Sequence, residues 1–382
     1  MTLRLKSTGS TGPCSARVFT NWAGHWAIET GMQPETNTSV TAIPTAPGST
    51  GLQTGLSVSL ILLLLLSLWI GWVPIAPDEL GPIVRAWIGN DTGQTIASKA
   101  LVLGLVRIPR SLATVLVGMG LSAAGAVYQG LFRNPLVSPD ILGVSAGATF
   151  GAALGLLMAG SSWLTIQALA FGCGLVAVGS ALLIARIVAV RPMLVLVLAG
   201  LVVMSVFNAA ITLLKYLSDP YNELPAIVFW IMGSMSRVQW GDLKLAAPVI
   251  GGSLVLIHVM RYKLNVLSLG DLQASSLGLN PRRDRLIFIF LSSITVSVSV
   301  AVCGQVLWVG LVMPHIARTL VGPNHEQMLP VAVLSGGIFL LLADTAARCL
   351  TMAELPISVV TAFTGAPLFA YLLYRNRGSG WS

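Results

Sequence analysis

The sequence predicts an all-α polytopic membrane protein, and its composition and the spacing of its apolar runs lead to that fold class. Charged residues make up only 9% of the 382 residues, whereas hydrophobic residues make up 55%. A soluble domain carries about 25% charged residues, so this chain has too few to cover a water-facing surface. The apolar residues also gather, from about residue 52 onward, in successive runs close to the length of a membrane span. These features exclude a soluble enzyme, a disordered chain and a nucleic-acid-binding domain.

The apolar runs predict ten transmembrane helices. Each run must be helical, because an unpaired backbone group in lipid costs several kcal/mol. The segment 307–321 is short and carries His315 and Arg318, which indicates a half-helix or a partial span. The segment 226–235 is too short to cross and predicts a surface helix. The predicted spans cover about residues 54–74, 108–132, 141–159, 163–189, 193–216, 243–260, 286–303, 307–321, 329–350 and 356–374.

Both ends of the chain differ from this apolar region. Residues 1–50 are rich in Ser, Thr, Gly and Pro and lack the apolar core of a secretory signal, so they predict a disordered cytoplasmic tail. Translation from Met32 is an alternative start. The transmembrane domain is expected over residues 51–376, followed by a short cytoplasmic tail at 377–382.

The distribution of Lys and Arg predicts the orientation. With the N-terminus inside, most of the 22 basic residues fall in segments on the inner side, as cytoplasmic loops require. The densest cluster lies in the loop 261–285, which also places the C-terminus inside. We therefore expect a multi-pass protein of the inner (plasma) membrane with both ends in the cytoplasm. The cluster comprises Arg261, Lys263, Arg282, Arg283 and Arg285.

The sequence lacks the usual signatures of catalysis, cofactor binding and metal binding. It contains no G-x-x-x-x-G-K-[ST] loop, and its four Cys and four His show no metal-ligand spacing. Few ionisable residues fall inside the spans, although Asp344 and Arg348 are four apart and are expected to pair at an outer helix end. We therefore expect no enzyme activity, cofactor or metal in this chain. Either another protein supplies the energy, or the chain is a passive channel.

Two local patterns predict surfaces for packing and docking. Gly143, Gly147, Gly151 and Gly155 recur every four residues, which favours close helix packing over a merely flexible helix. The loop 261–285 predicts a short amphipathic helix with Asp271 in its first turn, ending at Gly278. Such a helix either docks in a groove on a cytosolic partner or rests on the lipid surface.

Several motifs, taken in order, resemble the iron-siderophore and cobalamin class of ABC importer permeases. The resemblance runs from about Leu56 to Arg375, and the number and order of the motifs make it specific. The motifs are R-I-P-R (107–110), G-A-V-Y-Q-G (125–130), F-R-N-P (132–135), S-P-D (138–140), L-G-V-S-A-G (142–147), L-G-D-L-Q-A (269–274) with L-G (277–278), W-V-G-L-V-M-P-H-I-A-R (308–318), A-D (343–344), E-L-P (354–356) and T-G-A-P (364–367).

The resemblance implies an assembly and a coupling loop. It implies two permease subunits, identical or different, around one pathway, with two cytosolic ATPases that bind ATP and Mg²⁺, and an extracytoplasmic substrate-binding protein. Helices two to five and seven to ten are implied to form inverted repeats. The segment 267–280 is implied to seat in an ATPase cleft, although the signature E-A-A-x-x-x-G has Leu272 at its Glu position. The implied coupling residues are Leu269, Gly270, Asp271, Ala274, Leu277 and Gly278.

The same resemblance implies docking and pathway residues. Arg107, Arg110 and Arg348 match positions that pair with carboxylates of the binding protein, whereas helix-end snorkelling is the alternative. The pathway is expected along the fifth span and its tenth-span counterpart, with an inner gate at the turn between the fourth and fifth spans, near Arg191 and Pro192. The positions expected along the pathway are Met204, Ser205, Asn208 and Thr212.

Ferric siderophore is the expected cargo. Cobalamin, haem and molybdate-type oxyanions remain alternatives within the same class. An ATP-independent secondary carrier is an alternative from a different class.

Overall fold

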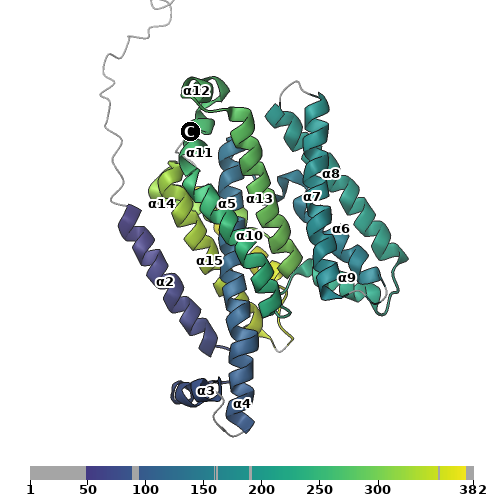
Figure 1. Cartoon of the computed structure of the whole chain (residues 1–382), viewed down its shortest axis with the longest axis vertical. Coiled ribbons are helices and arrows are strands. Elements are labelled where there is room, and N and C mark those ends of the chain that lie inside the picture. Colours follow the sequence, from purple (N-terminus) through teal and green to yellow (C-terminus); the bar gives the residue numbers. More distant parts are fainter. Residues whose placement is uncertain are drawn as a thin grey trace, which may run out of the picture. The chain divides into compact units, whose positions relative to one another are not determined.

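In the computed structural model, every regular element of the described residues is a helix (Figure 1). The described residues are 49–87, 94–158, 160, 162–188, 192–351 and 353–375. Most of the predicted N-terminal tail and all of the predicted C-terminal tail lie outside these ranges.

The N-terminal half contains the first five predicted spans. These are α2 (Ser49–Trp69), α5 (Ile108–Phe132), α6 (Val144–Leu157), α7 (Trp163–Val188) and α8 (Pro192–Leu217). Shorter pieces are η1 (Pro77–Glu79), α3 (Leu80–Trp87), α4 (Gln94–Leu101), the π-helix η2 (Val102–Arg107) and the 3-10 helix η3 (Pro139–Leu142).

The C-terminal half contains the other five. These are α10 (Trp240–Val259), α13 (Pro281–Cys303), α14 (Val309–Val321), α15 (His325–Leu350) and α16 (Ile357–Arg375). Between the halves lies the predicted surface helix, α9 (Glu223–Met232). The basic loop forms α11 (Arg261–Leu269) and α12 (Asp271–Ser276).

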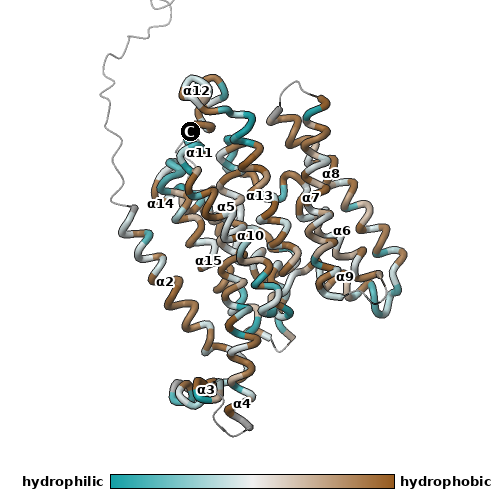
Figure 2. Tube along the Cα trace, viewed as in Figure 1, coloured by the Kyte–Doolittle hydropathy of each residue, from teal (hydrophilic) through white to brown (hydrophobic). Residues whose placement is uncertain are grey.

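Each predicted span corresponds to one helix, but the helices differ in length. Among the described residues, eight helices are long and apolar enough to cross a membrane. The helices α6 and α14, with 14 and 13 residues, are shorter. Apolar residues run along α2, α7 and α8, whereas α12 carries more hydrophilic ones (Figure 2). The surface of α7 and α8 is apolar because lipid or another protein, rather than water, faces it.

Residues with positive φ interrupt the helical backbone before the short helices α6 and α14. The helix α5 ends at Arg133, which is left-handed at φ 51°, and α6 begins after Gly143 at φ 77°. The helix α13 ends at Gly304 with φ 75°, and α14 begins after Trp308 with φ 70°. Each half therefore contains a long helix, a short helix and then two longer helices. This shared order is what an internal repeat predicts, while its inversion stays a prediction.

Glycine lets α5 pack at the centre of the helices around it. A Cβ atom on Gly125 would collide with the backbone of Gly310 in α14. Likewise, Gly118 faces the backbone carbonyl of Gly336 in α15. Glycine permits such close approach because it has no side chain. Close packing stabilises helix association in lipid, where no hydrophobic driving force acts between helices.

The glycines spaced by four in α6 fall into two groups. Gly147, Gly151 and Gly155 face α7, where a Cβ atom on Gly151 would collide with the carbonyl of Leu169. Gly143 lies before the helix and approaches the backbone of Met204 in α8. The four glycines therefore contact two helices rather than forming one continuous ridge.

The segment 75–107, which has no predicted element, is largely helical. The helices α4, η2 and α5 follow one another without a break, so that residues Ile96–Phe132 form one continuous helix of 37 residues. The helix α3 packs beside α4, around the buried Ile83. The sequence did not predict α3 and α4 because each has only eight residues, too few to show a clear helical periodicity.

We predict that Gly151→Ala destabilises the protein by about 1–3 kcal/mol, because the added methyl group overpacks the α6–α7 contact. Gly172→Ala in α7 is the matched control, since its Cβ atom would meet open space. Thermal unfolding in detergent measures both, and equal midpoints would contradict this packing role.

Candidate functional site

The helices α11 and α12 form a sharp corner at Gly270. Gly270 has φ 131°, a conformation that side chains rarely adopt. Asp271 then opens α12, and Arg285 Nη1 donates a 2.8 Å hydrogen bond to its Oδ2. This hydrogen bond holds the pKa of Asp271 below its usual value, so the ion pair is complete at neutral pH and is lost only on acidification through that lowered pKa. Pro281 occupies the first turn of α13, where Asn280 Oδ1 accepts from the backbone N–H of Arg283 at 3.1 Å.

The corner presents leucine side chains outward. The exposed fractions are 59% for Leu269, 82% for Leu272 and 58% for Leu277. In contrast, Leu267 and Ala274 are fully buried and hold the two short helices against the spans. We call Leu269, Leu272 and Leu277 the leucine patch. A patch of this kind on a polar loop is typical of a docking surface.

A hydrogen bond and an ion pair connect the same corner to the long helices α5 and α13. Arg133, at the end of α5, donates from Nη2 to the carbonyl of Leu267 at 3.2 Å. Lys263 in α11 bonds Asp284 of α13 at 2.8 Å.

A further contact joins the corner to α15. Asn265 of α11 accepts at Oδ1 from the backbone N–H of His325 at 2.8 Å, and its Nδ2 donates to Asn324 at 2.7 Å. A displacement of the corner therefore acts directly on α5, α13 and α15.

At the other end of α5, the predicted docking residue Arg110 is buried and paired within the chain. Its Nη2 lies 2.8 Å from Asp344 Oδ1, and its Nη1 lies 2.9 Å from Glu354 Oε1. The predicted pair of Asp344 with Arg348 is therefore wrong, because Arg110 occupies that carboxylate. Helical spacing alone did not show that α5 brings a competing arginine to α15.

The other two predicted docking arginines cap the end of α2. Arg107 donates from Nη1 to the carbonyl of Leu68 at 2.6 Å, and Arg348 donates from Nη2 to the carbonyl of Ser67. The last carbonyls of a helix have no partner within it, so these bonds satisfy groups that lipid would leave bare. Both arginines are only 5% exposed. Their docking role stays a prediction, which requires them to give up these partners.

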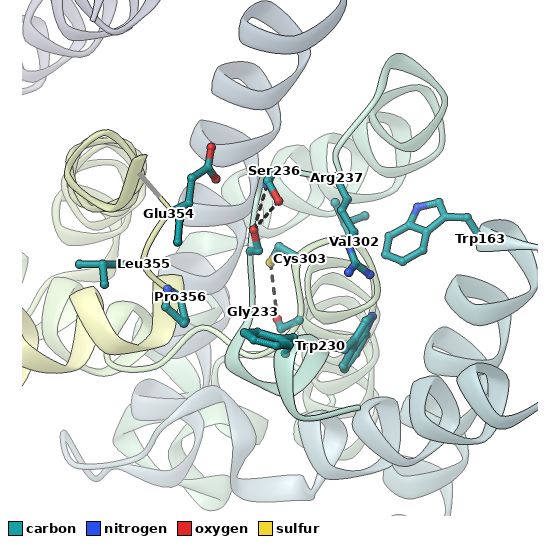
Figure 3. A pocket seen from close by; sticks show the side chains of 14 residues that line it. Trp163, Trp230, Gly233, Ser236, Arg237, Val302, Cys303, Glu354, Leu355 and Pro356 are labelled. Carbon is teal, nitrogen blue, oxygen red and sulfur yellow. Dashed lines mark hydrogen bonds between the residues drawn. The ribbon is translucent and has the colours of Figure 1, made fainter. Parts of the chain in front are cut away.

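Arg237, an exposed residue that the sequence analysis did not single out, lines one pocket together with Glu354 (Figure 3). Arg237 lies over the ring of Trp163, with its guanidinium carbon 5.9 Å from the ring centroid. Trp230 and Glu354 line the same pocket of about 180 Å³. Its lining residues come from α7, α9, α13 and three connections. Because these segments are far apart in the sequence, sequence analysis could not predict the pocket.

The predicted pathway positions share an open part of α8. Ser205, Asn208 and Thr212 are exposed, and Met204 is half-buried. Ser205 and Thr212 each donate to a carbonyl one turn earlier, so their hydroxyl groups add little polarity to that face. At the predicted gate, Arg191 and the side chain of Pro192 lie outside the described residues.

Long apolar helices together with short, interrupted ones are typical of membrane transporters. The sequence matches the FecCD transport family over residues 59–375, and the chain belongs to this family. It is thus an ABC importer permease, a multi-pass protein of the inner membrane.

Named relatives and a solved structure agree with this family. The molybdate import system permease protein MolB of Haemophilus influenzae is 38% identical, over 85% of this chain and 96% of that protein. A probable iron chelatin transport system permease protein of Helicobacter pylori is 36% identical, over 75% of this chain and 86% of that one. A structure described as an inward-facing conformation of a putative metal-chelate type ABC transporter is 35% identical, with a TM-score of 0.76. The match covers 85% of this chain and 99% of that one.

We predict that Asp344→Asn destabilises the protein by about 3–5 kcal/mol, because it leaves Arg110 as a buried charge without its main partner. Asp78→Asn removes an exposed carboxylate and serves as the control. Thermal unfolding compares the two, and similar midpoints would show that the Arg110 contacts contribute little.

Proposed function

We propose that this chain forms the membrane pathway of a binding-protein-dependent importer of a ferric siderophore, driven by two partner ATPases. A second permease subunit, identical or different, completes the pathway, and a substrate-binding protein delivers the cargo from outside. This chain makes and breaks no covalent bond, and the sequence contains no phosphate-binding loop for ATP. Its contribution is a shift between inward-open and outward-open states that its partners favour differently.

The proposed coupling to an ATPase rests on the leucine patch. Three exposed leucines on a rigid corner offer a partner an apolar surface, and the corner is bonded to α5, α13 and α15. An ATPase that grips the patch would move these helices together when ATP closes it. Resting on lipid explains the exposed leucines but gives no reason for the bonds to three long helices.

The open part of α8 supports a pathway between two subunits. Leu198, Val202 and Val206 are each more than half exposed, close to Ser205 and Asn208. An apolar face with a few small polar groups suits a pathway that passes bulky cargo without binding it tightly.

The relatives are named for several cargoes, among them iron chelates, molybdate, cobalamin and haemin. An iron chelatin is named for the Helicobacter relative, and a metal chelate for the similar solved structure, which favour the ferric siderophore. Molybdate is the second candidate, because the relative named for molybdate matches over 85% of this chain.

We predict that Leu272→Asp lowers binding-protein-stimulated ATP hydrolysis by the assembled importer at least tenfold, because the new charge must be desolvated in the ATPase cleft. Val84→Asp is the matched control, since Val84 is an exposed apolar residue of α3, at the end of the structure away from α12 (Figure 1). The chain purified alone should hydrolyse no ATP. If Leu272→Asp keeps the wild-type stimulation of ATP hydrolysis, the leucine patch does not couple the ATPase to this chain.

Uptake into vesicles tests the cargo and the energy source together. The full importer with its binding protein should accumulate a radiolabelled ferric siderophore only when ATP is present on the ATPase side. Accumulation of molybdate instead would replace the proposed cargo with the second one. Uptake that persists without the ATPase would favour an ATP-independent carrier and contradict the importer.

A further inference from the structure

A cavity of about 700 Å³ lies between the α7–α8 ends and the start of α13. Its rim is charged and comprises Arg186 of α7, Asp271 of α12, and Arg282 and Arg285 of α13. Three positive groups face one negative group, and Arg285 already pairs with that carboxylate. The rim therefore keeps an excess of positive charge.

Arg285 is the buried member of this rim. It is only 7% exposed, and its Nη atoms bond Asp271, whereas its Nε has no hydrogen-bond partner among the described residues. This buried guanidinium therefore keeps an unsatisfied N–H, and its positive charge favours an anion in the neighbouring cavity. Asp284, in the same first turn of α13, does not cancel this charge, because Lys263 pairs with it.

The wall behind the rim is apolar. It is made of side chains from one turn of α7, the first turns of α8, and the second and third turns of α13. They are Leu182, Leu183, Met193, Leu196, Leu286 and Ile289. Free phosphate would use only the arginines and leave this wall without a partner. A molecule with an anionic head and apolar chains would fill both parts.

We propose that this cavity binds the phosphate headgroup of an anionic phospholipid, with its acyl chains along α7 and α13. The exposed Arg186 and Arg282 supply charge-assisted hydrogen bonds, the buried Arg285 adds positive charge, and the apolar wall excludes water from the chains. The site requires only that α7 and α13 span the bilayer, so it does not depend on the cargo or on ATP. Because Arg285 also holds Asp271, the bound lipid would lie directly beside the coupling corner.

Lipid binding to the delipidated full-length chain tests the proposal. Native mass spectrometry and thermal unfolding would compare dioleoyl-phosphatidylglycerol, dioleoyl-phosphatidylcholine and inorganic phosphate. We expect phosphatidylglycerol to bind and raise the midpoint more than phosphatidylcholine, with no effect of millimolar phosphate. Equal effects of the two lipids would overturn the proposal, and equal protection by phosphate would replace the lipid with a free anion.

A pair of substitutions locates the site. Arg186→Gln with Arg282→Gln should weaken phosphatidylglycerol binding by roughly fivefold for each arginine lost, because a basic residue near anionic lipid contributes about 1 kcal/mol. Arg283→Gln is the matched control, since Arg283 is exposed beside Arg282 but does not line the cavity. Unchanged binding in the double variant, or equal loss in the control, would overturn the site. The lipid comparison on the unmodified chain stands even if the double variant fails to fold.

Discussion

The close approach of backbones around α5 is the constraint on which the rest of the structure depends. In lipid, helices gain nothing from hiding apolar side chains from water, so they associate through close contact and through satisfied polar groups. Gly118 and Gly125 let α15 and α14 approach α5 at the level of the backbone. Because α5 is buried along most of its length, every element that reaches the centre must be compatible with these two contacts.

The scarce charges of the chain work at the ends of this packed centre. At one end, Arg107 and Arg348 satisfy carbonyls of α2, and Arg110 joins α5 to Asp344 of α15. At the other end, Arg285 and Lys263 connect the corner of α11 and α12 to α13. Removing a single partner there leaves a buried charge, whereas an exposed pair can be lost at little cost.

Under the proposed function, this division would let a movement of the corner reach the long helices. The leucine patch is exposed, but the residues beside it are buried and bonded to three long helices. The patch is thus already ordered before the proposed partner binds it. The arginine-lined cavity lies next to the same corner, because Asp271 and Arg285 both line it.

The sequence by itself determined the class of fold, the ten helical segments and the short helix that begins at Asp271. Long apolar runs have only one way to satisfy their backbone in lipid, and an acidic residue is a local signal for the first turn of a helix. It did not determine α3 and α4, which are short and carry little periodicity. The partners of Asp344 and the pocket around Arg237 depended on helices distant in the chain. Only the tertiary structure decided these contacts, because helical spacing shows which residues share a face but not which helix arrives opposite it.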